Sequence, residues 1–293
     1  MAMNYIAARD LLLISGAESK YFSVKLVLYV LMISVGGSLA FNGGGYYWLG
    51  MGLIGLAIAH GVELQHQVLH GSAFLNKRVS HIVGFILGLP MLVSYSSYQF
   101  THLAHHDKVG TEDDVEFFEF NTLNDEQRWY GKVSSFLLLS HYAHFLKIVF
   151  NSILVREIIV EADEETNRYI RREYLTMAFL IVVFVAVSVV FDNYQYLLLW
   201  LVPLALFAAP THTLIELPEH FGCDNRSESI LRNTRTIRSS PFFVWFTNGN
   251  NYHVEHHMFP LVRPEKLSIL HRKMSVDIAY QNQSYFEFFM ESI

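Results

Sequence analysis

Histidine is the residue type whose number and spacing suggest chemistry in this chain, which has 15 of them among 293 residues. Three short segments hold most of these histidines at the spacing of a helix. They are QHQVLH with His66 and His70, THLAHH with His102, His105 and His106, and YHVEHH with His253, His256 and His257. Residues three and four apart share one helix face, so each segment directs its imidazoles toward a common point. Because neutral imidazole is a favoured ligand of zinc, copper, iron and nickel, the segments predict a metal site.

The number of imidazoles predicts how many metals the site holds. One pair of histidines four apart is usually ordinary polar surface, but three such segments, each beside a predicted membrane boundary, are not. Eight imidazoles exceed the four ligands of a closed zinc site and the six of one octahedral ion, which predicts two metals. The single cysteine, Cys223, excludes an internal disulfide and a cysteine-based metal cage.

The composition indicates a protein in contact with lipid. Apolar residues make up 52% of the chain and charged residues only 16%, and the mean hydropathy is +0.26. Soluble domains usually have about 25% charged residues. The formal net charge of -6 gives no support for nucleic-acid binding.

Four apolar stretches are long enough to cross a bilayer, at residues 22–41, 46–62, 174–191 and 194–210. Short turns join them into two antiparallel hairpins. Two further apolar stretches, 82–93 and 136–150, must turn back instead of crossing, because otherwise the three histidine segments would lie on opposite sides of the membrane.

This pattern predicts one all-α integral membrane domain over residues 1–293. It contains four transmembrane helices in two hairpins, re-entrant or interfacial helices, and a histidine-rich cap that holds two metals. Neither hairpin turn contains Lys or Arg, so all 21 basic residues fall on one side. Basic residues near span ends stay in the cytoplasm, which places both termini and the metal site there. Lys25, near the end of a span, is expected to snorkel toward the interface.

The histidine segments and their neighbours resemble the histidine boxes of the membrane fatty acid desaturase and hydroxylase family. His66 and His70 are followed by GSAF as in the first box, THLAHH by GTEDD as in the second, and NNYHVEHHMFP resembles the third. PEHFGC, followed by NTRT, resembles the bacterial branch, which implies His220 as a ninth ligand. The resemblance implies a non-haem centre of two Fe ions that uses O2, with electrons from a separate donor of the ferredoxin, rubredoxin or cytochrome b5 type.

Several other residues are candidates for holding the ligand imidazoles in place. Glu63 shares a helix face with His66 and His70, and Asp107 and Glu255 adjoin box histidines, where a carboxylate can accept the second imidazole N–H. Glu216 occupies a position where some relatives of the family place a water-mediated contact to iron. His212 is interpreted as a supporting residue or as a ligand. His60 lies off the helix face of His66 and is interpreted as structural. So are the remaining histidines, which lack a converging partner: His81, His141, His144 and His271.

The function predicted from these features is an O2-dependent desaturase that introduces a double bond into a fatty acyl or related lipid chain. The alternative is a lipid hydroxylase or ketolase of the same family, since the boxes do not separate these outcomes. A histidine-rich metal transporter is disfavoured, because transporters bind ions near the bilayer midplane and the boxes lie beyond the span ends. A basic stretch is interpreted either as a docking site for an acidic electron carrier or anionic lipid, or as a solvated face: Arg226, Arg232, Arg235 and Arg238.

Overall fold

The computed structural model describes residues 20–115, 117–118, 129–274 and 277–292. The N-terminus, for which the sequence predicts a cytoplasmic location, lies outside these residues. The described part of the chain is built almost wholly of helices, with one pair of three-residue strands.

The first hairpin consists of α2 (Lys20–Asn42), a 3-10 turn η1 (Gly44–Tyr46) and α3 (Tyr47–Leu69). The turn between the helices needs left-handed backbone, which glycine adopts without strain, and Gly43 and Gly44 have φ of 70° and 65°. The helices touch closely, since a Cβ at Gly50 would lie 2.5 Å from the carbonyl oxygen of Gly36. α3 then continues past the apolar stretch to carry His66 toward the centre of the molecule.

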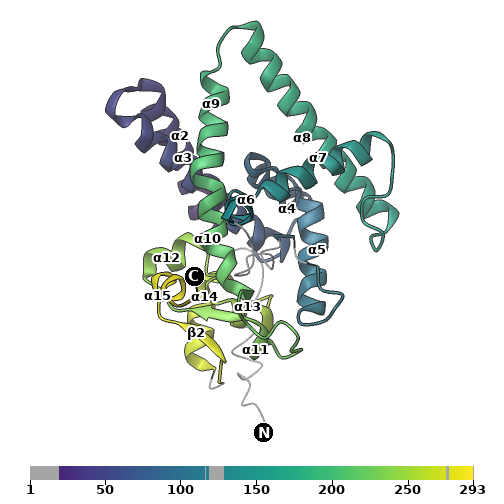
Figure 1. Cartoon of the computed structure of the whole chain (residues 1–293), viewed down its shortest axis with the longest axis vertical. Coiled ribbons are helices and arrows are strands. Elements are labelled where there is room, and N and C mark those ends of the chain that lie inside the picture. The colour runs from purple at the N-terminus through teal and green to yellow at the C-terminus, as the bar shows by residue number, and fades with distance from the viewer. Residues whose placement is uncertain (1–19, 116, 119–128, 275–276, 293) are drawn as a thin grey trace.

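The second hairpin consists of α8 (Glu164–Val190) followed by α9 (Gln195–Pro203), a π-helical turn η3 (Leu204–Ala208) and α10 (Ala209–His220). Asp163 caps α8, accepting a 2.7 Å hydrogen bond from the Thr166 backbone N–H. Pro203 cannot donate to the helix ladder, and the irregular turn η3 follows it directly. Figure 1 shows the α8–α9 turn at one end of the molecule.

The four predicted spans are confirmed as four helices long and apolar enough to cross a membrane: Lys20–Asn42, Gly44–Leu69, Glu164–Val190 and Gln195–His220. In the apolar windows of α2 and α8 only 22% of the residues are buried by the protein, so most of this apolar surface faces outward. A lipid environment accounts for an apolar surface of this kind.

The two remaining apolar stretches form bent helix pairs. α4 (Lys77–Gly88), a 3-10 turn η2 (Leu89–Met91) and α5 (Tyr95–Lys108) make a pair bent by 96°. α6 (Trp129–Phe136) and α7 (Leu139–Ile153) are bent by 66°. By length and composition alone, each bent pair could also be a single membrane span with a break in it. The first bend, however, returns α5 to the end of α3, as the sequence requires of a segment that turns back.

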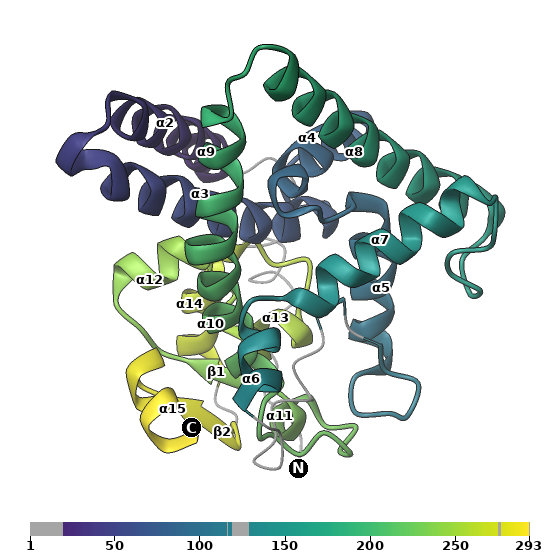
Figure 2. The same ribbon diagram turned by 45° about the horizontal axis from the view of Figure 1, so that its top comes forward.

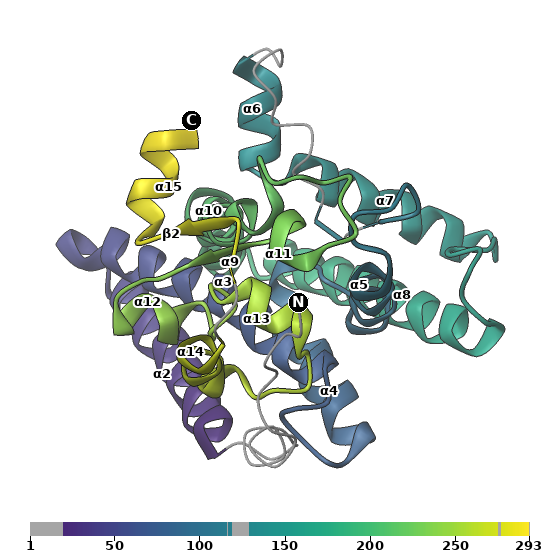
Figure 3. The same cartoon turned by 90° about the horizontal axis from the view of Figure 1, so that it is seen from below.

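The C-terminal part of the chain forms a cap at the end of the molecule opposite the α8–α9 turn (Figures 1 and 3). Its two strands, β1 (Arg235–Ile237) and β2 (Tyr280–Asn282), pair in parallel. α13 (His253–Met258) contacts β1, and Figure 2 shows α10 running from the second hairpin down to this region. The other cap helices are α11 (Ile230–Asn233), α12 (Pro241–Phe246), α14 (Pro264–Lys273) and α15 (Tyr285–Ser292).

Two polar side chains of the first hairpin join it to the cap. Lys25 is buried and its Nζ donates a 2.6 Å hydrogen bond to Asn248 Oδ1, so the expectation that it snorkels is wrong. The cap supplies an acceptor that a lone membrane helix lacks. His60 stacks on Trp245 and Phe246 of α12, with ring centroids 4.9 and 5.7 Å away. These contacts fix the end of α3 against the cap.

Candidate metal centre

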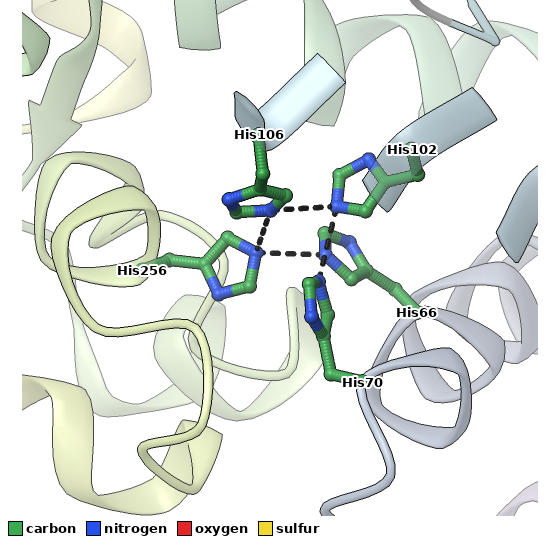
Figure 4. A group of neighbouring side chains, drawn as sticks. All are labelled: His66, His70, His102, His106 and His256. Carbon is green, nitrogen blue, oxygen red and sulfur yellow. Dashed lines mark hydrogen bonds between the residues drawn. The ribbon is translucent and has the colours of Figure 1, made fainter. Parts of the chain in front are cut away.

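Five imidazoles from three separate helices form one compact group (Figure 4). α3 and its C-terminal end supply His66 and His70, α5 supplies His102 and His106, and α13 supplies His256. His66 Nε2 lies 3.0 Å from His256 Nε2, and His102 Nε2 lies 3.1 Å from His70 Nε2. His106 Nε2 joins the two pairs, at 3.0 Å from His102 and 3.1 Å from His256. We call these residues the five-histidine group.

A second group of imidazoles lies beside the first. It contains His105 of α5, His220 at the end of α10 and His257 of α13, with His105 Nε2 3.3 Å from His220 Nε2. His253 lies at its edge, because its Nε2 is 3.1 Å from His257 Nε2. The ring of His257 stacks on that of His106, with centroids 4.1 Å apart, so the two groups touch. We call these four residues the four-histidine group.

The other ring nitrogen, Nδ1, indicates which tautomer these imidazoles adopt. Nδ1 of His105 lies 2.7 Å from Asp114 Oδ1, and Nδ1 of His220 lies 2.9 Å from the carbonyl oxygen of Asn233. Carboxylate and carbonyl oxygens only accept, so each Nδ1 is the protonated nitrogen and donates. The Nε2 lone pairs of His105 and His220 therefore face each other.

This arrangement fits metal binding. A neutral imidazole has one N–H, so a cluster in which Nε2 atoms approach to about 3 Å cannot be satisfied by hydrogen bonds throughout. A cation between them removes the repulsion of the lone pairs, and imidazole nitrogen is a ligand that iron, zinc and copper accept. Each group offers the nitrogens for one ion.

Burial keeps the cap imidazoles neutral. The pKa values of His253, His256 and His257 lie well below the ordinary 6.5, first because burial removes solvent from the charged form and second because neighbouring imidazoles would repel it. Their lone pairs are therefore free to bind metal at neutral pH.

All nine histidines predicted as ligands lie in these two groups, and their assignment as ligands stays a prediction. The carboxylates predicted to hold them in place behave differently. Asp107 is exposed, and the carboxylate that contacts His105 is Asp114. Glu255 is buried, but it accepts a 2.7 Å hydrogen bond from Thr236 Oγ1 and contacts His271 Nδ1 instead of a box histidine. Side chains next to a ligand along a helix point away from it, which explains both differences.

Glu63 is connected to the five-histidine group through an asparagine that the sequence did not single out. Asn250 Nδ2 donates a 2.6 Å hydrogen bond to Glu63 Oε2 and lies 3.0 Å from His66 Nδ1. Glu216 lies with Glu63 and His212 in a separate buried group. Glu219, also absent from the sequence prediction, is buried with Oε2 3.2 Å from His253 Nε2.

Arg235, predicted as part of a surface basic stretch, is buried. Its Nη1 donates hydrogen bonds of 2.6 and 2.7 Å to the carbonyl oxygens of Pro218 and Phe221, on either side of His220. Arg226, Arg232 and Arg238 are exposed, and Arg232 pairs with Asp224 at 3.3 Å. Arg235 therefore holds the backbone on either side of His220, which is a predicted ligand.

The histidines interpreted as structural lie outside both groups. His60 contacts α12 as described, and His141 Nε2 lies 3.0 Å from the carbonyl oxygen of Met91. His81 pairs with Glu173 at 3.2 Å, while His271 contacts Glu255. His144 lines a cavity beside α5.

Comparison with known proteins identifies relatives of the chain. A family model described as fatty acid desaturase matches residues 39–289. A protein named fatty acid desaturase from Bacillus subtilis (strain 168) is 26% identical over 226 residues, which cover 70% of this chain and 62% of the relative. The chain thus matches about three fifths of the length of that relative.

Proposed function

Because the chain belongs to the fatty acid desaturase family, we propose that it is an O2-dependent diiron oxidoreductase that introduces a double bond into a fatty acyl or related lipid chain. The observation that carries the proposal is the pair of touching histidine groups, one with five and one with four imidazoles. The nine histidines would hold two iron ions through neutral nitrogen ligands, and the ions would supply the oxidative chemistry that uses O2.

The proposed reaction removes two hydrogens from adjacent methylenes. One O2, two electrons and two protons are consumed for each double bond, and two waters are released. Unactivated C–H bonds are beyond the reach of side-chain acids and bases, and a bound diiron centre supplies the oxidising power. The protein has to hold the ligands, position the chain and limit access of water.

A cavity of about 450 Å³ beside α5 is our candidate for the acyl binding site. Thr101, next to the ligand His102, lines it together with Phe117, Phe118 and Ile148. Tyr98 lies between the cavity and the metal ligands, since its ring is 5.0 Å from that of Phe117 and 5.5 Å from that of His102. The cavity is lined by apolar and aromatic side chains together with polar ones such as Ser97, His144 and Glu161, and a largely apolar lining is typical of sites for small molecules.

The proposal is tested by mass spectrometry of total lipids from a host that expresses the protein, beside a host that expresses His256→Ala. His256 belongs to the five-histidine group, so the variant should lose the product. A product two mass units lighter than its precursor, present only with the native protein, is expected. Protein level and metal content are measured in both hosts, so that loss of the product in the variant can be distinguished from loss of the protein itself.

The same spectra separate the alternative activity. A gain of sixteen mass units would identify a hydroxylase, and a gain of fourteen would identify a ketolase. Identical lipid profiles from the two hosts, with metal bound and an electron donor present, would contradict the proposal.

We propose a separate electron donor of the ferredoxin, rubredoxin or cytochrome b5 type, and a metal site on the cytoplasmic side. The exposed residues of the basic stretch, Arg226, Arg232 and Arg238, offer a face for an acidic carrier. Changing all three to Ser should slow turnover with the native donor and leave the metal content unchanged. Turnover equal to that of the native protein would contradict docking at this face.

A further inference from the structure

Glu219 of α10 places a carboxylate against a metal-facing nitrogen of the four-histidine group. Its Oε2 is 3.2 Å from Nε2 of His253, and both residues are buried. Asp114 also contacts a predicted ligand, His105, but it does so at Nδ1, on the other side of the ring from the Nε2 atom that faces the group. Glu219 therefore lies where a metal ligand would lie, whereas Asp114 lies where a group that supports a ligand would lie.

The distances around His253 match the spacing of ligand atoms on one ion. Its Nε2 lies 3.1 Å from Nε2 of His257 and 3.2 Å from Oε2 of Glu219. The ring of His220, the residue after Glu219, has its centroid 5.0 Å from that of His253. Nitrogen and oxygen ligands bind zinc at about 2.0–2.2 Å, so neighbouring ligand atoms on one ion are about 3 Å apart. Oε2 of Glu219 thus fits the same ligand shell as the imidazoles.

The predicted role of His253 as a ligand leaves it no proton to donate to Glu219. A neutral imidazole has one N–H, and a ring that binds an ion through Nε2 carries its hydrogen on Nδ1. The lone pairs of His253 Nε2 and Glu219 Oε2 then face each other at 3.2 Å inside the protein. Such a contact is unfavourable unless a cation lies between the two atoms.

We propose that Glu219 is a further metal ligand and binds the ion of the four-histidine group through Oε2. This inference rests on the metal centre of the proposed function. Carboxylate oxygen and imidazole nitrogen occur together as ligands of zinc and of non-haem iron. A ligating carboxylate normally keeps other hydrogen-bond partners, so further contacts of Glu219 are compatible with this role. The two ions then differ in charge environment, because the five-histidine group consists of imidazoles alone.

The experiment measures metal affinity in the purified full chain. The protein in detergent is loaded with Zn²⁺ and titrated with a chelator of known affinity, and the zinc that stays bound is counted by elemental mass spectrometry. Glu219→Gln should bind one of the two ions about 10- to 100-fold more weakly than the native protein and the other ion equally well. Glu255→Gln is the matched control, because Glu255 is also buried beside a predicted ligand but contacts Thr236 and His271. It should hold both ions like the native protein.

Equal affinities in Glu219→Gln and the native protein would overturn the proposal. If Glu219→Gln does not fold, anomalous scattering from crystals of the zinc-loaded native protein decides without any variant. A zinc ion about 2.0–2.2 Å from Oε2 of Glu219 is expected. An ion held by histidines of the group but out of contact with Oε2 would show that Glu219 only accepts a hydrogen bond from His253, and would overturn the proposal. Neither measurement needs turnover, so failure here is distinguished from failure of the proposed desaturation, which the lipid spectra test.

Discussion

Three of the predicted ligand imidazoles have a partner at their second ring nitrogen, Nδ1. His105 has a carboxylate there, His220 a backbone carbonyl and His66 an asparagine. Among the described residues, His102, His106, His253 and His257 have no hydrogen-bond partner at Nδ1. The rings of His105, His220 and His66 are thus oriented by direct partners at Nδ1.

Replacing Asp114 by Asn should weaken metal binding in the four-histidine group. The carboxylate that accepts a hydrogen bond from His105 Nδ1 makes the Nε2 lone pair a stronger metal ligand. Loss of such a carboxylate typically costs about 10- to 100-fold in metal affinity. Competition with a chelator of known affinity measures the change. Asp107→Asn is the matched control, since Asp107 is exposed, and it should bind metal like the native protein. Equal losses from the two variants would contradict the role of Asp114.

His141 should make the stability of the protein depend on pH. Burial lowers its pKa from 6.5 to about 4, although the hydrogen bond to the Met91 carbonyl opposes the change. Below pH 6.5 the unfolded chain binds a proton that the folded chain refuses, so stability falls from pH 6.5 down to about 4. Two and a half pKa units correspond to about 3 kcal/mol over the full range.

His141→Gln removes this titration and retains a donor for the carbonyl. The native protein should therefore lose about 2 kcal/mol relative to the variant between pH 7.5 and pH 5. Chemical unfolding in detergent at the two pH values measures the difference. A gap between the two proteins that does not change with pH would show that His141 is not buried in its neutral form.

Helical spacing predicted which histidines lie together, because residues three and four apart must share a face whatever surrounds them. Asp114 was missed because it follows α5 in a turn, where spacing does not predict direction. Arg235 was assigned to the surface because charged side chains are rarely buried. It is buried because α10 packs against β1, a contact that the sequence does not reveal.

At the scale of elements, hydropathy locates the spans but not the helices that contain them. The predicted span at 174–191 belongs to a helix that begins at Glu164, and the one at 194–210 to a helical run that ends at His220. The added turns are polar and lie outside the apolar window. They nevertheless matter for function, since the added part of α10 carries His212, Glu216 and His220.

The stability of the fold around the C-terminal end of α10 should depend on Arg235. Its guanidinium donates to two backbone carbonyls around His220 and lies 4.6 Å from the ring of Phe288. Lys cannot reach both carbonyls with one planar group, so Arg235→Lys should destabilise the fold by about 3 kcal/mol. Thermal unfolding in detergent measures this, with the exposed Arg226→Lys expected to be neutral. An Arg235→Lys protein as stable as the native one would show that these two hydrogen bonds do not stabilise the end of α10.

At the scale of the whole molecule, the two histidine groups form where the two hairpins and α5 meet the cap. α3 delivers His66 from the first hairpin, α10 delivers His220 from the second, and α13 supplies the cap ligands (Figure 2). No single hairpin carries a complete group. Metal binding should therefore couple the two hairpins to the cap, because predicted ligands from both hairpins and from the cap must come together.

The orientation of this assembly in the membrane can be tested with single cysteines in a Cys223→Ser background. Gly45→Cys lies in the first hairpin turn, where an added Cβ meets open space, and Arg226→Cys lies on the exposed surface of the cap. The distribution of basic residues predicts that the cap lies in the cytoplasm. A membrane-impermeant maleimide should therefore label Gly45→Cys in intact cells, and Arg226→Cys only after the cells are permeabilised. The reverse pattern would put the metal groups on the outer side, where cytoplasmic electron donors could not reach them.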